Sequence, residues 1–84
     1  MSTDDNLLYL LRNVTVRRLH AALLRDGFTL RRQRGSGRIY THPDGRITNI
    51  HYHGGGETLP RGTLGSVLQA VGWTAEDARR LRLL

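Results

Sequence analysis

The order of hydrophobic patterns along these 84 residues predicts a two-layer α+β domain, in which a helix is followed by three antiparallel strands and a second helix. Apolar residues recur at helical spacing over positions 16–24 and again over 64–71. Between these segments, polar and apolar residues alternate and are interrupted by short turns that contain glycine, which favours strands. Both helices are then expected on one face of the sheet, with short extra helical segments at the termini.

The first long helix is expected to begin after Thr15, which is a favourable N-cap for the apolar stripe that follows. Asp26-Gly27 supplies its C-terminal stop, because glycine adopts the left-handed conformation without strain. Residues 1–13 are interpreted as an N-terminal extension, in which Asp5-Asn6 could cap a short helix. Residues 14–84 are then expected to form the functional domain.

Three strands are expected over residues 28–34, 38–42 and 46–52. Gly35-Ser36-Gly37 is a tight connection, and Pro43-Asp44-Gly45 is a strong hairpin signal, since proline presets one turn dihedral and glycine accepts the left-handed one. Ile47 and Ile50 have opposite parity in the third strand. The buried face of that strand therefore stays open, and a bulge is suspected there.

A glycine-rich loop over residues 54–62 leads into the second long helix, for which Thr63 is the expected N-cap and Gly72 the stop. The loop lacks the Gly-Lys-Ser/Thr of a Walker phosphate loop, so that type of nucleotide site is excluded. Trp73 is expected to fill the core, and the run from Thr74 to Asp77 resembles a capping box that opens a last short helix.

The formal charge of +6 comes entirely from arginine, since the chain contains no lysine. Guanidinium groups fork onto phosphate oxygens, so nucleic acid is one expected partner and an acidic protein is the alternative. The absence of cysteine excludes a disulfide framework and thiolate metal sites. The acidic start does not resemble a secretory signal, and the apolar cluster over 7–11 is too short to span a bilayer. A soluble cytoplasmic protein is therefore expected.

The stretch from 31 to 46 is the most informative about function. The residues expected to bind RNA are Arg31, Arg32, Arg34, Ser36, Arg38, Tyr40 and Arg46. Glycines let backbone N–H groups approach an anion, guanidinium groups neutralise phosphate charge, and the tyrosine ring offers a surface for base stacking. The alternative is a solvated strand edge, on which arginines discourage pairing with another strand.

His51 and His53 would share one face of a regular strand. A metal would need a third ligand, and Glu57 is the sole carboxylate nearby in the sequence, so no metal site is expected. General acid–base work on RNA suits histidine better, because imidazole ordinarily titrates near neutral pH. Two polar residues at a strand end remain the simpler interpretation.

Taken in order, these motifs resemble the HicA toxin family over about residues 15–82. The residues that carry the resemblance are Gly27-Phe28, Arg32–Ser36, Tyr40, His42–Arg46, His53, Gly62–Leu64, Val67-Leu68 and Gly72–Thr74. The resemblance implies an α-β-β-β-α fold similar to double-stranded-RNA-binding domains. It also implies a metal-independent messenger-RNA endonuclease that needs no cofactor and arrests growth, and an inhibitory antitoxin partner of the HicB type.

Gly37 departs from the family pattern. In the family the Gly-Ser of this motif is followed by a histidine that is taken as catalytic, and here that position is Gly37. Loss of a general base typically costs about a hundredfold to ten-thousandfold in rate, so this chain is expected to be impaired. An introduced substitution and a weakened native copy both explain the glycine. His53 aligns with a family histidine and is expected to be auxiliary, and His51, where the family often has proline, is a further candidate for a substitute base.

A rival hypothesis is a module that binds RNA or an antitoxin without catalysis. DNA binding ranks third, because the sequence offers no helix-turn-helix with a basic recognition helix. The sequence leaves the oligomeric state open.

Overall fold

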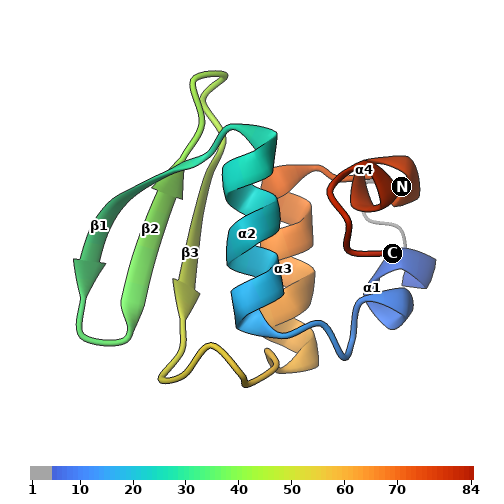
Figure 1. Cartoon of the computed structure of the whole chain (residues 1–84), viewed down its shortest axis with the longest axis horizontal. Helices are drawn as coiled ribbons and strands as arrows, with labels where there is room; N and C mark the ends of the chain where they lie inside the picture. Colours follow the sequence, from blue (N-terminus) through green and yellow to red (C-terminus); the bar gives the residue numbers. More distant parts are fainter. Residues whose placement is uncertain (1–4) are drawn as a thin grey trace.

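The chain forms an α+β domain in which three antiparallel strands are covered on one face by helices (Figure 1). The computed structural model describes residues 5–84. Its elements are α1 (Asp5–Leu10), α2 (Val16–Asp26), β1 (Thr29–Arg34), β2 (Gly37–Thr41), β3 (Ile47–His51), α3 (Arg61–Val71) and α4 (Ala75–Arg80). The predicted fold class is confirmed, and the strand order β1-β2-β3 is compatible with a module of the double-stranded-RNA-binding type.

The helices α2 and α3 lie side by side against the sheet, whereas α1 and α4 lie on the far side of that pair (Figure 1). The core between the layers consists of apolar residues from every helix and from β2 and β3. Leu7 and Leu11 of the N-terminal segment are among its most deeply buried side chains. The opposite face of the sheet carries no helix of the described chain and is open to solvent.

The ends of α2 agree with the prediction. The Thr15 hydroxyl accepts a hydrogen bond from the Arg18 backbone N–H at 3.3 Å. Gly27 adopts a φ of 105° and its N–H donates to the carbonyls of Leu23 and Leu24, which ends the helix. A side chain at Gly27 would also meet the His42 imidazole at 2.9 Å, so both the dihedral angle and the space favour glycine here.

The sheet corrects the expectation of a bulge in the third strand. The irregularity lies in β1, between Leu30 and Arg32, whereas β3 pairs regularly with β2 from Ile47 to His51. Thr48 and Ile50 face the helices and are buried, and Ile47 is 60% exposed. The unequal parity of the two isoleucines thus reflects one isoleucine in the core and one on the open face.

The start of α3 also differs from the prediction. The helix begins at Arg61 with Pro60 as its N-cap, whereas the sequence predicts Thr63 as the N-cap. The Leu64 N–H donates to the Pro60 carbonyl at 2.8 Å, so Thr63 lies within the first helical turn. Proline is compatible with a helix start because the N–H that it lacks would have no partner within the helix.

The C-terminal predictions are confirmed. Trp73 is buried, and Thr74 and Asp77 form a reciprocal capping box at the start of α4. Along residues 5–84, no helix has the length and apolar character that crossing a lipid bilayer requires.

Candidate functional site

Two rows of side chains cross the open face of the sheet, each with one residue from every strand. Arg34, Gly37 and His51 are paired in one row, and Arg32, Ile39 and Asn49 are paired in the next. The bulge at Arg31 sets this arrangement, because it shifts the parity of β1 so that Arg32 and Arg34 share a face with Ile39 and Gly37.

These six residues line a shallow groove of about 230 Å³. Two guanidinium groups, an imidazole and an amide thus converge on one apolar side chain and one glycine, and no carboxylate lines the groove. Such a lining attracts phosphate, because arginine presents several N–H donors to its oxygens. The groove can therefore hold a phosphodiester next to a group that can accept a proton.

The turn between β1 and β2 joins Arg34 to Gly37 beside the groove, and contacts on the other face of the sheet hold it in place. The Ser36 carbonyl accepts hydrogen bonds from Arg38 Nη1 at 2.9 Å and from the Tyr52 backbone N–H at 2.9 Å. The Arg38 guanidinium also lies over the Tyr52 ring, 4.0 Å from its centre. Arg38 therefore supports the turn from the side that faces the helices, whereas Arg31 and Arg34 are exposed.

Tyr40 lies in the core, on the opposite face of β2 from the groove. Its hydroxyl lies 2.7 Å from Nδ1 of His20 on α2. Burial, together with contact with Tyr52, raises the pKa of Tyr40 well above its usual value, so the hydroxyl stays protonated in its hydrogen bond with the imidazole. In this position the Tyr40 ring is not accessible for stacking with a base.

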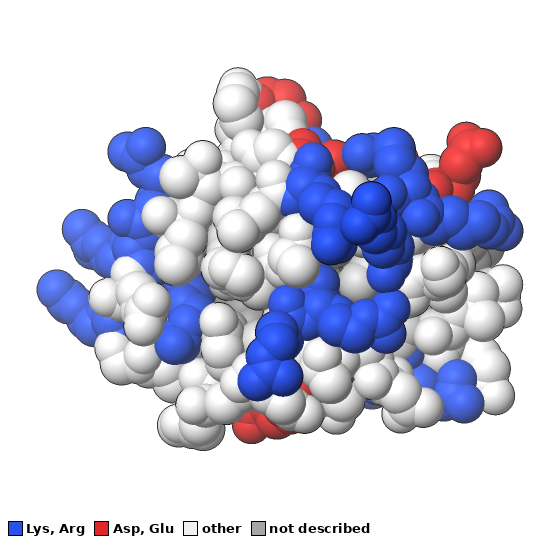
Figure 2. Space-filling model, viewed as in Figure 1, with Lys and Arg blue, Asp and Glu red and all other residues white. Residues whose placement is uncertain are grey.

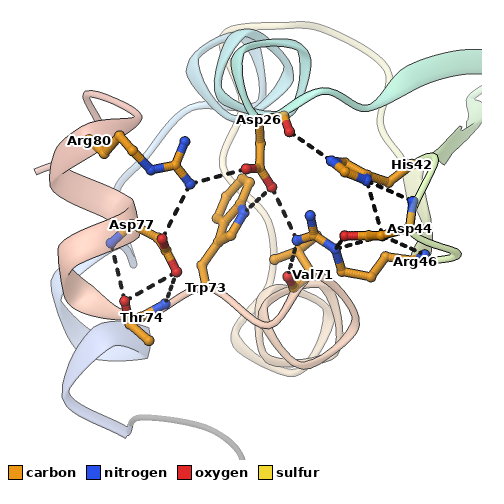
Figure 3. A network of polar contacts seen from close by, with 9 residues as sticks. All are labelled: Asp26, His42, Asp44, Arg46, Val71, Trp73, Thr74, Asp77 and Arg80. Carbon is orange, nitrogen blue, oxygen red and sulfur yellow. Dashed lines mark hydrogen bonds and ion pairs between the residues drawn. The ribbon is translucent and has the colours of Figure 1, made fainter.

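Arg46 lies at the far end of the sheet, in a network of polar contacts centred on Asp26 (Figure 3). Its Nη1 is 3.1 Å from Asp26 Oδ2, its Nε is 2.8 Å from Asp44 Oδ2, and it also donates to the Val71 carbonyl. Burial tends to raise the pKa of Asp44, but hydrogen bonds from Arg46 outweigh it and the pKa is lowered. Arg46 thus connects β3 and its hairpin to the helices, away from the groove.

The histidines differ sharply in environment. His53 lies past the end of β3 and is exposed, and its backbone N–H donates to Glu57 Oε1 at 2.6 Å. His20 of α2 bonds the hydroxyl of Tyr40 in β2, and His42 bonds the carbonyl of Asp26 at the end of α2. His51 alone among them lines the groove. Across the described residues, no group of three His, Asp or Glu side chains is arranged to hold a metal ion.

The structure brings three of the predicted site residues together in the groove, Arg32, Arg34 and Gly37, with Ser36 in the adjoining turn. The sequence reasoning did not single out Asn49 or Ile39, and it ranked His51 below His53. The period of two along β3 could have linked Asn49 to His51, since alternate residues of a strand share a face. The sequence pattern did not indicate that the strand ends at His51, so it did not show that His53 lies outside the strand.

Arginines also gather outside the groove. Figure 2 shows one group along the sheet and a second group over the helices, with some acidic residues next to the second group. The second group includes arginines that donate to C-terminal carbonyls, such as Arg18 to Arg82 and Arg25 to Leu81. These side chains hold the end of the chain against α2, whereas Arg32 and Arg34 have no such partner carbonyl in the described structure.

Comparison with known protein families gives a match over residues 16–73 to the family described as the HicA toxin of bacterial toxin–antitoxin systems. A search of curated proteins gives no significant match. The matched segment extends from the start of α2 to Trp73 and includes the whole sheet, the groove and α3. The chain therefore belongs to the HicA toxin family, whose members are RNA-cleaving toxins.

Proposed function

We propose that this chain is the toxin component of a HicA/HicB-like system and binds messenger RNA in the cytoplasm through the open face of its sheet. Its ancestral activity is metal-independent endoribonuclease cleavage, and a HicB-like antitoxin covers the same face. The observation that carries the proposal is the groove in which Arg34 is paired with Gly37 and Arg32 lies two residues before it on the same face of β1. A phosphate there would lie beside two cations, with no carboxylate in the lining to repel it.

Within this proposal, the predicted RNA-binding residues divide by their surroundings. Arg31, Arg32 and Arg34 are exposed on β1 and contact phosphates directly. Ser36 and Arg38 act through the turn, which stays in place because Arg38 and Tyr52 hold its carbonyl. Arg46 and Tyr40 contribute by fixing the sheet on the helices.

The lack of a side chain at Gly37 limits catalysis in the proposed function. Metal-free RNA cleavage needs a base to take the proton of the 2′-hydroxyl, and cations to stabilise the charge that develops on the phosphate. The arginines supply the second requirement, but glycine has no group that could supply the first. The chain as it stands is therefore impaired relative to a version with histidine at this position.

The substitution Gly37→His tests this proposal. The backbone at Gly37 is outside the left-handed region, so a side chain is tolerated there once the neighbouring imidazole of His51 turns aside. We expect cleavage of a labelled single-stranded RNA in EDTA to rise by about a hundredfold, at the lower end of what a general base supplies. Growth arrest on expression should become stronger.

Gly37→Gln is the matched control, because it adds similar bulk without a base. It should bind RNA, and its cleavage rate should not rise above that of the unchanged chain. If Gly37→His and the unchanged chain both leave RNA intact, and neither arrests growth, the endoribonuclease proposal is wrong.

The alternative function is a module that binds RNA or an antitoxin without catalysis. Exposed apolar side chains near the termini favour a protein partner, since Tyr9 is 57% and Leu84 is 45% exposed. Binding of a protein through such residues should respond weakly to salt, whereas RNA binding by several arginines should weaken steeply. A titration at several salt concentrations therefore separates the two.

A further inference from the structure

The imidazole of His51 lies over the bare backbone of Gly37. The two residues are directly paired between β3 and β2. A Cβ atom placed on Gly37 would lie 3.0 Å from His51 Cε1 and 3.3 Å from its Nδ1. The ring thus occupies the space that a side chain at position 37 would take, and glycine at this position is what permits the close approach.

The surroundings of this imidazole suit proton transfer at a phosphodiester. Arg34 is paired with Gly37 from the other side, so the row has a guanidinium group on one side of the glycine and, on the other, an imidazole that reaches over it. Arg32 and Asn49 extend the groove, and the Asn49 amide nitrogen is 3.4 Å from His51 Nε2. The charged groups that face His51 are these two arginines of β1; β2 contributes only Gly37 and Ile39, and no described helix covers this face.

The other histidines are excluded from this role by their positions. His53 lies beyond the strand, in the loop held by Glu57, and does not line the groove. The rings of His20 and His42 are bonded to Tyr40 and to the Asp26 carbonyl, on the side of the sheet that faces the helices. A nucleotide in the groove would therefore meet one imidazole.

We infer that His51 is the general base of a slow RNA cleavage by this chain, supplied from β3 in place of a side chain at position 37. This inference rests on the proposed function. His51 takes the proton of the 2′-hydroxyl, and the 2′ oxygen forms a bond to the adjacent phosphorus while the bond to the 5′ oxygen breaks. The 5′ oxygen leaves with a proton from water, and the resulting hydroxide recovers the proton held by His51. The products are a 2′,3′-cyclic phosphate and a 5′-hydroxyl end, and the arginines stabilise the phosphate charge.

The first test compares the unchanged chain with His51→Gln in EDTA, using a 5′-labelled single-stranded RNA. We expect the cleavage rate to fall by about a hundredfold, whereas RNA affinity changes little because the phosphate-binding arginines remain. The decrease expected for His51→Gln and the increase expected for Gly37→His, each about a hundredfold, together span about ten-thousandfold in rate. This is within the range that a general base typically supplies. His53→Gln is the comparison variant. If cleavage is lost in His53→Gln and retained in His51→Gln, the assignment is wrong.

A second pair of variants separates catalysis from a structural role. His51→Ala should regain cleavage when free imidazole is added, because the small base can enter the space that the ring has left. Gly37→Ala keeps His51 but places a methyl group against its ring, so it should slow cleavage without lowering RNA affinity. Thermal unfolding of each variant checks that the fold is retained.

The outcomes also separate this inference from the proposed function. RNA binding without cleavage by the unchanged chain, or cleavage that persists in His51→Gln, overturns the role of His51 and leaves RNA binding standing. Failure of the unchanged chain to bind RNA at all removes the proposed function, and the inference with it.

Discussion

Asp26 is the residue on which the polar contacts between the sheet and the helices converge. Its carboxylate accepts from Trp73 Nε1 at 2.8 Å, and it pairs with Arg46 and Arg80, each at 3.1 Å (Figure 3). The side chain is only 9% exposed, whereas Arg80 is 54% exposed and contributes less because solvent screens it. A buried carboxylate with three donors is stable as the anion, and removal of its charge leaves those donors poorly matched.

We therefore expect Asp26→Asn to destabilise the fold at neutral pH by about 1–3 kcal/mol, measured by urea unfolding. Asp44→Asn is the matched control, since Asp44 bonds the same arginine from an exposed position and should matter less. Equal losses for the two variants would contradict the central role of Asp26.

The pH dependence of stability follows from the same carboxylate. Burial tends to raise the pKa of Asp26, but hydrogen bonds from Trp73 and Arg80 and the charge of Arg46 outweigh it, so the pKa lies below the ordinary 3.8. A carboxyl whose pKa is lowered by folding stabilises the fold above its ordinary pKa, and this contribution is lost as the pH falls through the lowered value. The unfolding curves of the unchanged chain and of Asp26→Asn should thus converge in acid. A constant difference down to the lowest pH would count against this account.

At the scale of elements, α4 and the C-terminal residues form an addition beyond the segment that matches the family. Arg18 and Arg25 of α2 donate to carbonyls of Arg82 and Leu81, at 3.0 and 3.1 Å. Ala78 and Leu81 are buried in the shared core. The addition is thus tied to α2 by both hydrogen bonds and apolar contacts.

The capping box at Thr74 fixes where this addition begins. The Thr74 hydroxyl accepts from the Asp77 N–H at 3.2 Å, and Asp77 Oδ2 accepts from the Thr74 N–H at 2.9 Å. Thr74→Ala should cost about 1 kcal/mol of stability, as loss of an N-cap typically does, whereas Thr74→Ser should cost much less. Hydrogen exchange should show faster opening of α4 in the alanine variant. Unchanged exchange there would mean that the core contacts alone hold the helix.

At the scale of the whole molecule, the arginines divide into a group on the open sheet face and a group over the helices (Figure 2). The net charge of +6 attracts RNA to either group at long range. Only the arginines that contact phosphate release counterions on binding, and the salt dependence of affinity counts them. The slope of affinity against salt therefore reports which group is used.

Replacing Arg32 and Arg34 together with alanine should reduce the salt slope for single-stranded RNA by about 1.4, since each phosphate contact contributes about 0.7. Arg79→Gln removes a charge from α4 on the helical side and should leave the slope unchanged. Fluorescence anisotropy at several salt concentrations measures both. An equal decrease in the two variants would show that RNA binding does not centre on the sheet face.

The sequence by itself determined the element order, the caps of α2 and α4, and the hairpin at Pro43-Asp44-Gly45, because each depends on residues within a few positions of one another. The order of motifs was also enough to predict the family, which the comparison confirms. The boundary between residues 1–13 and the rest stays a prediction.

Only the tertiary structure decided which side chains share the open face. A one-residue bulge in β1 reverses the parity of every residue after it, and the sequence signal for its place is weak. Likewise, Thr48 and Ile50 are buried against the helices, so the alternate residues of β3 lie on the open face. This places His51 beside Gly37, and no local sequence pattern determines it. The groove joins residues of three strands, so its composition depends on register, which long-range packing sets.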